Sequence, residues 1–92
     1  MKEVTVEMMR QALIACKPWN CSKEEISGRL AGMSDEQLKE TDVIHELKFT
    51  SLDLAELTMH LEKESDHYSP HENEIIEASH ISVAKIMDFY ND

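Results

Sequence analysis

The sequence predicts an all-α fold in a single domain that covers residues 1–92. The chain contains only two glycines and two prolines, the residues that most disfavour helices and dominate turns. Apolar residues recur at intervals of three and four along several segments, as on one face of a helix. Serine or threonine stands just before most of these segments, where such residues cap helices. A chain of this length leaves no room for a second domain.

The first helix is predicted over Glu3–Cys16 and a second, shorter helix over Ser22–Ala31. The apolar face of the first helix comprises Val6, Met9, Leu13 and Cys16. Pro18 ends this helix, because proline has no backbone N–H group to donate to the helix ladder. Trp19 is expected to cover the edge of the core.

Two capping boxes are predicted next, in Ser22–Glu25 and in Ser34–Gln37. In each, a serine is followed three residues later by Glu or Gln, so each side chain satisfies the free backbone N–H group of the other residue. The helix after Ser34 meets a polar run at residues 39–42 and is expected to last only one or two turns. The loop that follows is expected to be anchored on the core by Val43, Ile44 and Leu47.

The best-defined helix is predicted over Ser51–Glu64. Thr50 is its expected N-cap, and Asp53 lies in its first turn, where a carboxylate interacts favourably with the positive helix end. An inward stripe comprises Leu54, Leu57, Thr58 and Leu61. A second apolar stripe comprises Leu52, Ala55 and Met59. One core does not need to cover both, so the second stripe is either buried under the preceding loop or free to contact a partner.

Two more helices are predicted near the C-terminus. Ser69 is the expected N-cap of a helix over Pro70–Ala78, because proline is favoured at the first helical position and Glu72 stands where a glutamate completes a capping box. The last helix restarts at Ser79 or Ser82. Its apolar face comprises Val83, Ile86, Met87 and Tyr90.

The chain is strongly acidic, with 19 acidic residues, nine basic residues and a formal net charge of −10. This charge repels nucleic-acid phosphates and anionic lipid headgroups, so the expected partner is a basic protein surface. No segment approaches the roughly 20 apolar residues of a membrane span, and the N-terminus lacks the apolar run of a signal peptide. We therefore expect a soluble, cytoplasmic protein.

Neither a metal site nor a catalytic site is expected. Cys16 and Cys21 are the only cysteines, and a disulfide between them would close too small a loop to stabilise the fold much. Their spacing is wider than the usual Cys-x2-Cys of zinc sites, and no matching histidine pair follows. No pattern combines a nucleophile, a base and an oxyanion hole, so we expect no enzymatic activity.

The segment Ser51-Leu52-Asp53, followed by Glu56-Leu57 and Leu61-Glu62, resembles the prosthetic-group site of acyl carrier proteins. The likeness extends from Val43 through this helix and includes residues 83–90, which are similar to the last helix of that family. The family usually has Gly, a variable residue and Asp before its serine, where this chain has Lys48, Phe49 and Thr50.

The resemblance implies a four-helix bundle with a long first loop and an extra short helix. Both Glu3–Cys16 and Ser22–Ala31 are candidates for the first helix of the family. We prefer Glu3–Cys16, because it is longer and more amphipathic, and regard the other segment as an insertion. Thr50 keeps the capping function of the family's Asp and lacks its charge.

The resemblance further implies a 4′-phosphopantetheine group, attached to Ser51 by a phosphopantetheinyl transferase. The protein is then a monomeric acyl carrier that delivers thioester intermediates to enzymes with basic docking patches. The expected docking residues are Leu52, Asp53, Ala55, Glu56 and Met59. The pathway stays open among fatty acid, polyketide, nonribosomal peptide, lipid A and other acyl transfer. The alternative is an unmodified carrier-like fold that binds other proteins through its acidic second helix.

Overall fold

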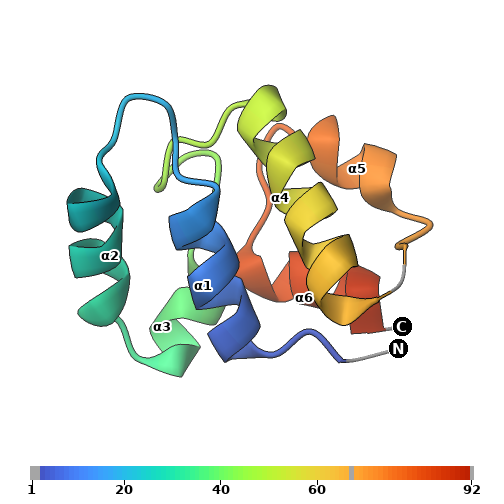
Figure 1. Ribbon diagram of the computed structural model, residues 1–92, viewed down its shortest axis with the longest axis horizontal. Coiled ribbons are helices and arrows are strands. Elements are labelled where there is room, and N and C mark those ends of the chain that lie inside the picture. Colours follow the sequence, from blue (N-terminus) through green and yellow to red (C-terminus); the bar gives the residue numbers. More distant parts are fainter. Residues whose placement is uncertain (1–2, 67, 92) are drawn as a thin grey trace.

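The computed structural model describes residues 3–66 and 68–91, which contain six helices and no strand (Figure 1). The helices are α1 (Val6–Ala15), α2 (Lys23–Ala31), α3 (Asp35–Glu40), α4 (Ser51–Ser65), α5 (Glu72–Ile76) and α6 (Val83–Asn91). The prediction of an all-α fold is therefore confirmed. The described residues form one compact body of 30 × 24 × 20 Å.

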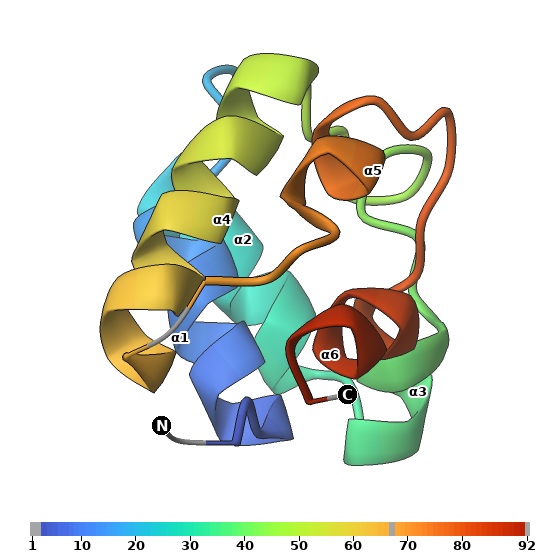
Figure 2. The ribbon, with the colours of Figure 1, turned by 90° about the vertical axis from the view of Figure 1, so that its right-hand side faces the viewer.

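Helices α1 and α4 pack side by side (Figures 1 and 2). Helix α2 packs on the side of α1 that faces away from α4, α5 packs against α4, and α3 pairs with α6. The inward faces of these helices share one core, whose largest fully buried side chains include Met9, Leu13, Leu30, Leu54, Leu57, Leu61, Ile86 and Tyr90. The first and last described segments lie at the same end of the molecule, where Val4 is hydrogen-bonded to Asn91.

Helix α1 begins at Val6, three residues later than predicted, because Thr5 caps it. The Thr5 hydroxyl accepts a hydrogen bond from the Met8 backbone N–H (3.1 Å). The preceding Val4 is fully buried and paired with the far end of the chain. Its N–H donates to the Asn91 side-chain oxygen (2.7 Å), and its carbonyl accepts from the Asn91 amide nitrogen (2.9 Å).

The capping boxes predicted at Ser22 and Ser34 have different outcomes. At Ser34 the box is complete, because its hydroxyl accepts from the Gln37 N–H and the Gln37 side chain accepts from the Ser34 N–H. At Ser22 only half of it forms. The Ser22 hydroxyl accepts from the Glu25 N–H (3.1 Å), but the Glu25 carboxylate contacts that same hydroxyl (3.3 Å) and not the backbone. The short helices after both serines are confirmed.

The predicted helix over Pro70–Ala78 is wrong at both ends, since α5 covers only Glu72–Ile76. The predicted cap by Ser69 and Glu72 is also wrong, because the N-cap of α5 is His71. The cause is a contact between segments that are distant in the sequence. The Ser69 hydroxyl donates to the Phe89 carbonyl in α6 (2.8 Å) and accepts from the His71 N–H (3.1 Å). These bonds hold residues 69–71 as a turn beside α6, so the helix starts later. Ser82 precedes α6 and accepts from the Lys85 N–H, which decides the choice between Ser79 and Ser82.

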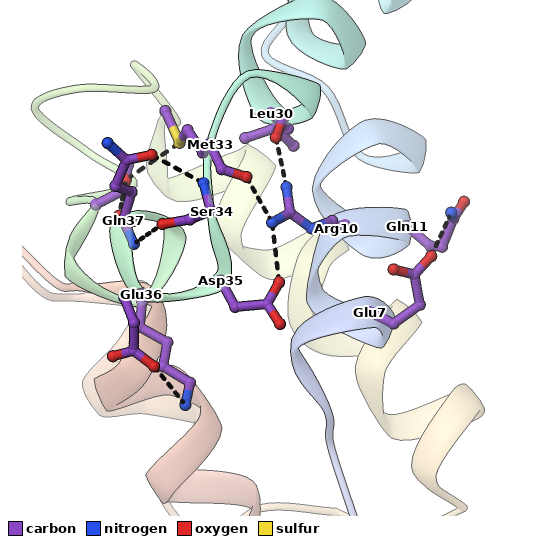
Figure 3. A network of polar contacts seen from close by, with 11 residues as sticks. Glu7, Arg10, Gln11, Leu30, Met33, Ser34, Asp35, Glu36 and Gln37 are labelled. Atoms are coloured by element: carbon purple, nitrogen blue, oxygen red, sulfur yellow. Dashed lines mark hydrogen bonds and ion pairs between the residues drawn. The ribbon is translucent and has the colours of Figure 1, made fainter.

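Arg10 connects three helices (Figure 3). Its guanidinium donates to the carbonyl of Leu30 near the end of α2, to the carbonyl of Met33 (2.8 Å) and to the carboxylate of Asp35 in α3 (3.1 Å). Carbonyls at the C-terminal end of a helix lack donors within that helix. The side chain of Arg10 thus satisfies them and holds α2 and α3 on α1.

Arg10→Met is expected to lower the free energy of unfolding by about 1.5 to 3 kcal/mol, because it removes charge-assisted hydrogen bonds and keeps the aliphatic stem. Urea unfolding followed by circular dichroism measures the change. Gln11→Met is the matched control, since the exposed Gln11 side chain donates to the exposed Glu7 carboxylate on the same helix (3.1 Å; Figure 3) and joins no other helix by a hydrogen bond among the described residues. Equal small losses in both variants would show that the guanidinium does not hold the three helices together.

Candidate functional site

The segment at residues 41–50 carries the chain into α4 and is fastened to the core. The Val43 N–H donates to the Ile81 carbonyl (2.9 Å), and the Val83 N–H donates to the Thr41 carbonyl (3.0 Å). Val43 and Leu47 are buried and Ile44 is half-buried, so the predicted anchoring is confirmed. Phe49 is a further buried anchor that the sequence interpretation did not name.

Lys48 has a left-handed backbone conformation, with φ of 65°. Glycine adopts this conformation at no steric cost, whereas the Cβ of other residues meets a backbone oxygen. Lys48 is exposed, so no burial of its side chain offsets the strain. The loop before α4 therefore has a backbone shape that suits glycine better than lysine.

Lys48→Gly is expected to raise the free energy of unfolding by about 1 kcal/mol, because it relieves the strained backbone. Chemical denaturation measures the difference. Lys48→Ala removes the same charge and retains a Cβ atom, so it should give little gain. If the two variants are equally stable, the lysine charge rather than the backbone accounts for the effect.

Thr50 and Asp53 form a complete capping box at the start of α4, as expected for the N-cap. The Thr50 hydroxyl accepts from the Asp53 N–H (3.2 Å). The Asp53 carboxylate accepts from both the backbone N–H and the hydroxyl of Thr50, at 2.9 Å each. Asp53 is only 6% exposed. The Asp53 carboxylate thus caps the helix. Of the two acidic residues among the predicted docking residues, Glu56 is the one whose side chain is exposed.

Ser51 is the first residue of α4, and its side chain is exposed. Within residues 3–66 and 68–91, its hydroxyl has no hydrogen-bond partner, because the preceding Thr50 does the capping. The first backbone N–H groups of a helix have no carbonyl partner within it and carry a partial positive charge. Ser51 therefore presents an available hydroxyl at a helix end that favours an attached anion.

The two predicted apolar stripes of α4 face opposite environments. Each member of the inward stripe, Leu54, Leu57, Thr58 and Leu61, is buried, as predicted. In the second stripe, Leu52 is 70% exposed, Met59 is 65% exposed and Ala55 is half-buried. Burial under the preceding loop is thus wrong for Leu52 and Met59. These side chains, together with the exposed Glu56, form an accessible face of α4 that begins one residue after Ser51.

Cys16 lies at the C-terminal end of α1, where it is buried. Burial raises the pKa of its thiol, and the negative charges of Glu56 and Asp53 raise it further. The thiol is therefore protonated and unreactive near neutral pH. Cys16 and the half-buried Cys21 are free thiols. The described residues contain no group of three or more His, Cys, Asp or Glu side chains placed to hold a metal ion.

Trp19 does not cover the core, contrary to the prediction. Its side chain is 77% exposed, at the tip of a turn between α1 and α2. Tyr68, on the connection that follows α4, is similarly exposed at 79%. The apolar character of Trp19 suggested burial, but the proline before it and the asparagine after it are typical of a turn, which lies at the surface.

Comparisons of the chain with protein-family models, with curated proteins and with solved structures found no significant match. No helix among the described residues has the length and apolar character needed to span a lipid bilayer. The candidate site consequently rests on its own geometry: an anchored loop, a capped helix, an exposed serine and an adjoining apolar and acidic face.

Proposed function

We propose that this protein is a carrier whose Ser51 bears a 4′-phosphopantetheine arm, and that it delivers an acyl or related thioester-bound intermediate to partner enzymes. The observation that carries this proposal is the exposed hydroxyl of Ser51, which has no hydrogen-bond partner among the described residues and stands at the first position of the 15-residue helix α4. Thr50 caps the helix, so the serine is not needed for folding. Its hydroxyl is available for modification.

The local electrostatics support a phosphodiester at this position. The positive end of α4 and its free N–H groups stabilise a phosphate joined to the Ser51 oxygen. The buried Phe49 and Leu47 hold the preceding loop on the core, so the serine is presented from a fixed backbone. The backbone at Lys48 has the conformation that glycine prefers, and glycine is the usual residue of carrier proteins at that place.

Under this proposal, α1, α4, α5 and α6 correspond to the four helices of the carrier bundle, and α2 and α3 are additions within its first long loop. The packing of α1 on α4 and of α5 on α4 supports this correspondence. So does the position of α2, which packs on the outer side of α1 (Figure 1). The protein acts as a monomeric shuttle with no catalytic activity of its own.

Partner enzymes would meet the accessible face of α4. Leu52, Ala55 and Met59 supply its apolar part, and the exposed Glu56 supplies negative charge next to the modified serine. Basic patches on partners complement this charge and accelerate association. Asp53 contributes indirectly, because its carboxylate completes the cap that orients the first turn of α4.

The test is incubation of the protein with coenzyme A and a broad-specificity phosphopantetheinyl transferase. We expect intact-mass spectrometry to show a gain of one phosphopantetheine group, and peptide mapping to locate it at Ser51. The proposed function places the protein in the cytoplasm, where coenzyme A is available. A protein that gains no mass, even with the transferase of its own organism, would contradict the proposed function.

The second candidate is an unmodified carrier-like module that binds proteins through α4. The observation that favours it is Thr50, which leaves the position before Ser51 without the negative charge usual in carrier proteins. A transferase that recognises its substrates by this charge would then not modify the protein. The exposed face of α4 serves binding equally well in this case.

A further inference from the structure

Trp19 is held in place although its side chain is exposed. The Cys21 N–H donates to the Pro18 carbonyl (3.1 Å), which closes a four-residue turn with Trp19 and Asn20 at its centre. Pro18 and Cys16, on the N-terminal side of the turn, are buried, and Cys21 is half-buried. The backbone that carries the indole is thus anchored on both sides, so the ring is displayed from an ordered turn.

This turn lies near the serine end of α4. Both ribbon views place the α1–α2 connection beside the first turn of α4 (Figures 1 and 2). Cys16 is close enough to Asp53 and Glu56 for their charges to act on its thiol. Trp19 follows Cys16 by three residues, a span of at most about 10 Å. A protein that reaches Ser51 therefore also reaches this turn.

An exposed tryptophan is a large apolar surface that folding leaves in contact with water. Tryptophan is the residue type most enriched among side chains that dominate binding energy at interfaces, usually by filling a pocket of the partner. Leu52, adjacent to Ser51, is also 70% exposed. Two uncovered apolar side chains, on the α1–α2 turn and on α4, thus flank the same end of the molecule.

The charges near this surface indicate the character of its occupant. Around the α1–α2 turn, the positive charges of Lys17 and Lys23 are equal in number to the negative charges of Glu24 and Glu25. Near Ser51, both Glu56 on α4 and Lys48 in the preceding loop are exposed. The net negative charge that a partner meets is that of the chain as a whole, at −10. A partner with an apolar pocket and basic residues toward α4 is complementary to it, whereas an anionic lipid surface is repelled.

We propose that Trp19 is a docking anchor, which inserts into an apolar pocket on the enzymes that act at Ser51, while Leu52 extends the apolar contact and Glu56 contacts the basic rim of that pocket. This inference rests on the proposed function. It adds to the docking surface of this protein a residue that lies outside α4. The anchor positions the partner over the serine and takes no part in the chemistry.

Steady-state kinetics with the broad-specificity phosphopantetheinyl transferase test the anchor. Trp19→Ala is expected to raise the KM for the carrier at least tenfold, with kcat changed less than twofold. Tyr68→Ala is the matched control, because Tyr68 is equally exposed but lies beside Met59, Glu62 and Lys63 in the C-terminal half of α4, away from the α1–α2 turn. An unchanged KM in Trp19→Ala, or an equal rise in Tyr68→Ala, would overturn the proposal.

A second measurement does not depend on modification. Trp19 is the only tryptophan of the chain, so incorporation of 5-fluorotryptophan gives a single ¹⁹F resonance. This resonance should shift when unlabelled transferase is added and should stay unchanged with phosphatidylserine vesicles. A shift with vesicles alone would assign Trp19 to a membrane surface and overturn the proposal. If the protein is never modified, the proposed function fails, but the docking role of Trp19 is still tested. A ¹⁹F resonance that shifts with the transferase would support this docking role, whereas a resonance that does not shift would contradict it.

Discussion

Ser51→Ala is expected to abolish the gain of phosphopantetheine mass completely and to leave the fold unchanged. The hydroxyl of Ser51 is the proposed attachment point and makes no hydrogen bond in the described structure, whereas Thr50 and Asp53 continue to cap α4. Intact-mass spectrometry after treatment with coenzyme A and transferase measures the loss, and a thermal unfolding curve checks the fold. A variant that still gains the group would place the attachment at another residue.

Substitutions at Thr50 separate loss of recognition from loss of the site. Thr50→Asp restores the negative charge before the serine and should be modified at least as fast as the parent. Thr50→Asn is its neutral, near-isosteric control, and both residues cap helices well. In Thr50→Asp the new carboxylate lies near that of Asp53, which the threonine hydroxyl contacts at 2.9 Å, so some loss of stability is expected.

The pattern among these variants decides between the two candidate functions. Modification of the parent supports the carrier. Modification of Thr50→Asp alone, with the parent and Thr50→Asn unmodified, would show a carrier fold that lacks its recognition charge, and the interaction module would replace the carrier as the proposed function. If Thr50→Asn is modified as fast as Thr50→Asp, charge at this position is not what the transferase reads.

Leu57→Ala is expected to lower the free energy of unfolding by about 2 to 5 kcal/mol. Leu57 has no exposed surface and lies where α4 meets the core, so truncation removes buried methyl groups and leaves a cavity. Urea unfolding measures the change. For a domain of 92 residues this is a large part of the total stability, and partial unfolding at room temperature is an expected consequence.

Leu52→Ala is the matched control for this prediction, because it makes the same chemical change on the exposed stripe of α4. Its unfolding free energy should stay within about 0.5 kcal/mol of the parent. Comparable losses at the two positions would show that the exposed stripe also packs against part of the protein in solution. The accessible face proposed for partners would then be withdrawn.

Local features of this protein followed from the sequence alone. The capping box at Ser34, the N-cap at Thr50 and the inward stripe of α4 depend on residues at most a few positions apart or on one repeating interval. Such interactions form within a single helix, so the sequence pattern and the structure agree. The exposed serine at the first position of α4 belongs to this class.

Ser22 marks the limit of local prediction. Its pattern matches that of Ser34, but the Glu25 carboxylate accepts from the Ser22 hydroxyl instead of from the Ser22 backbone N–H. Ser22 and Glu25 have the same spacing in either arrangement. An exposed glutamate has several rotamers of similar energy, so sequence spacing permits the box without enforcing it.

Only the tertiary structure decided the features that join distant segments. The late start of α5 follows from the bond between Ser69 and Phe89, and the burial of Val4 follows from its pairing with Asn91. The exposure of Trp19 depends on where its turn leaves the packed helices. Hydrophobicity favours burial of every apolar side chain, whereas the limited area of a small core admits only those that the packing of helices brings inward.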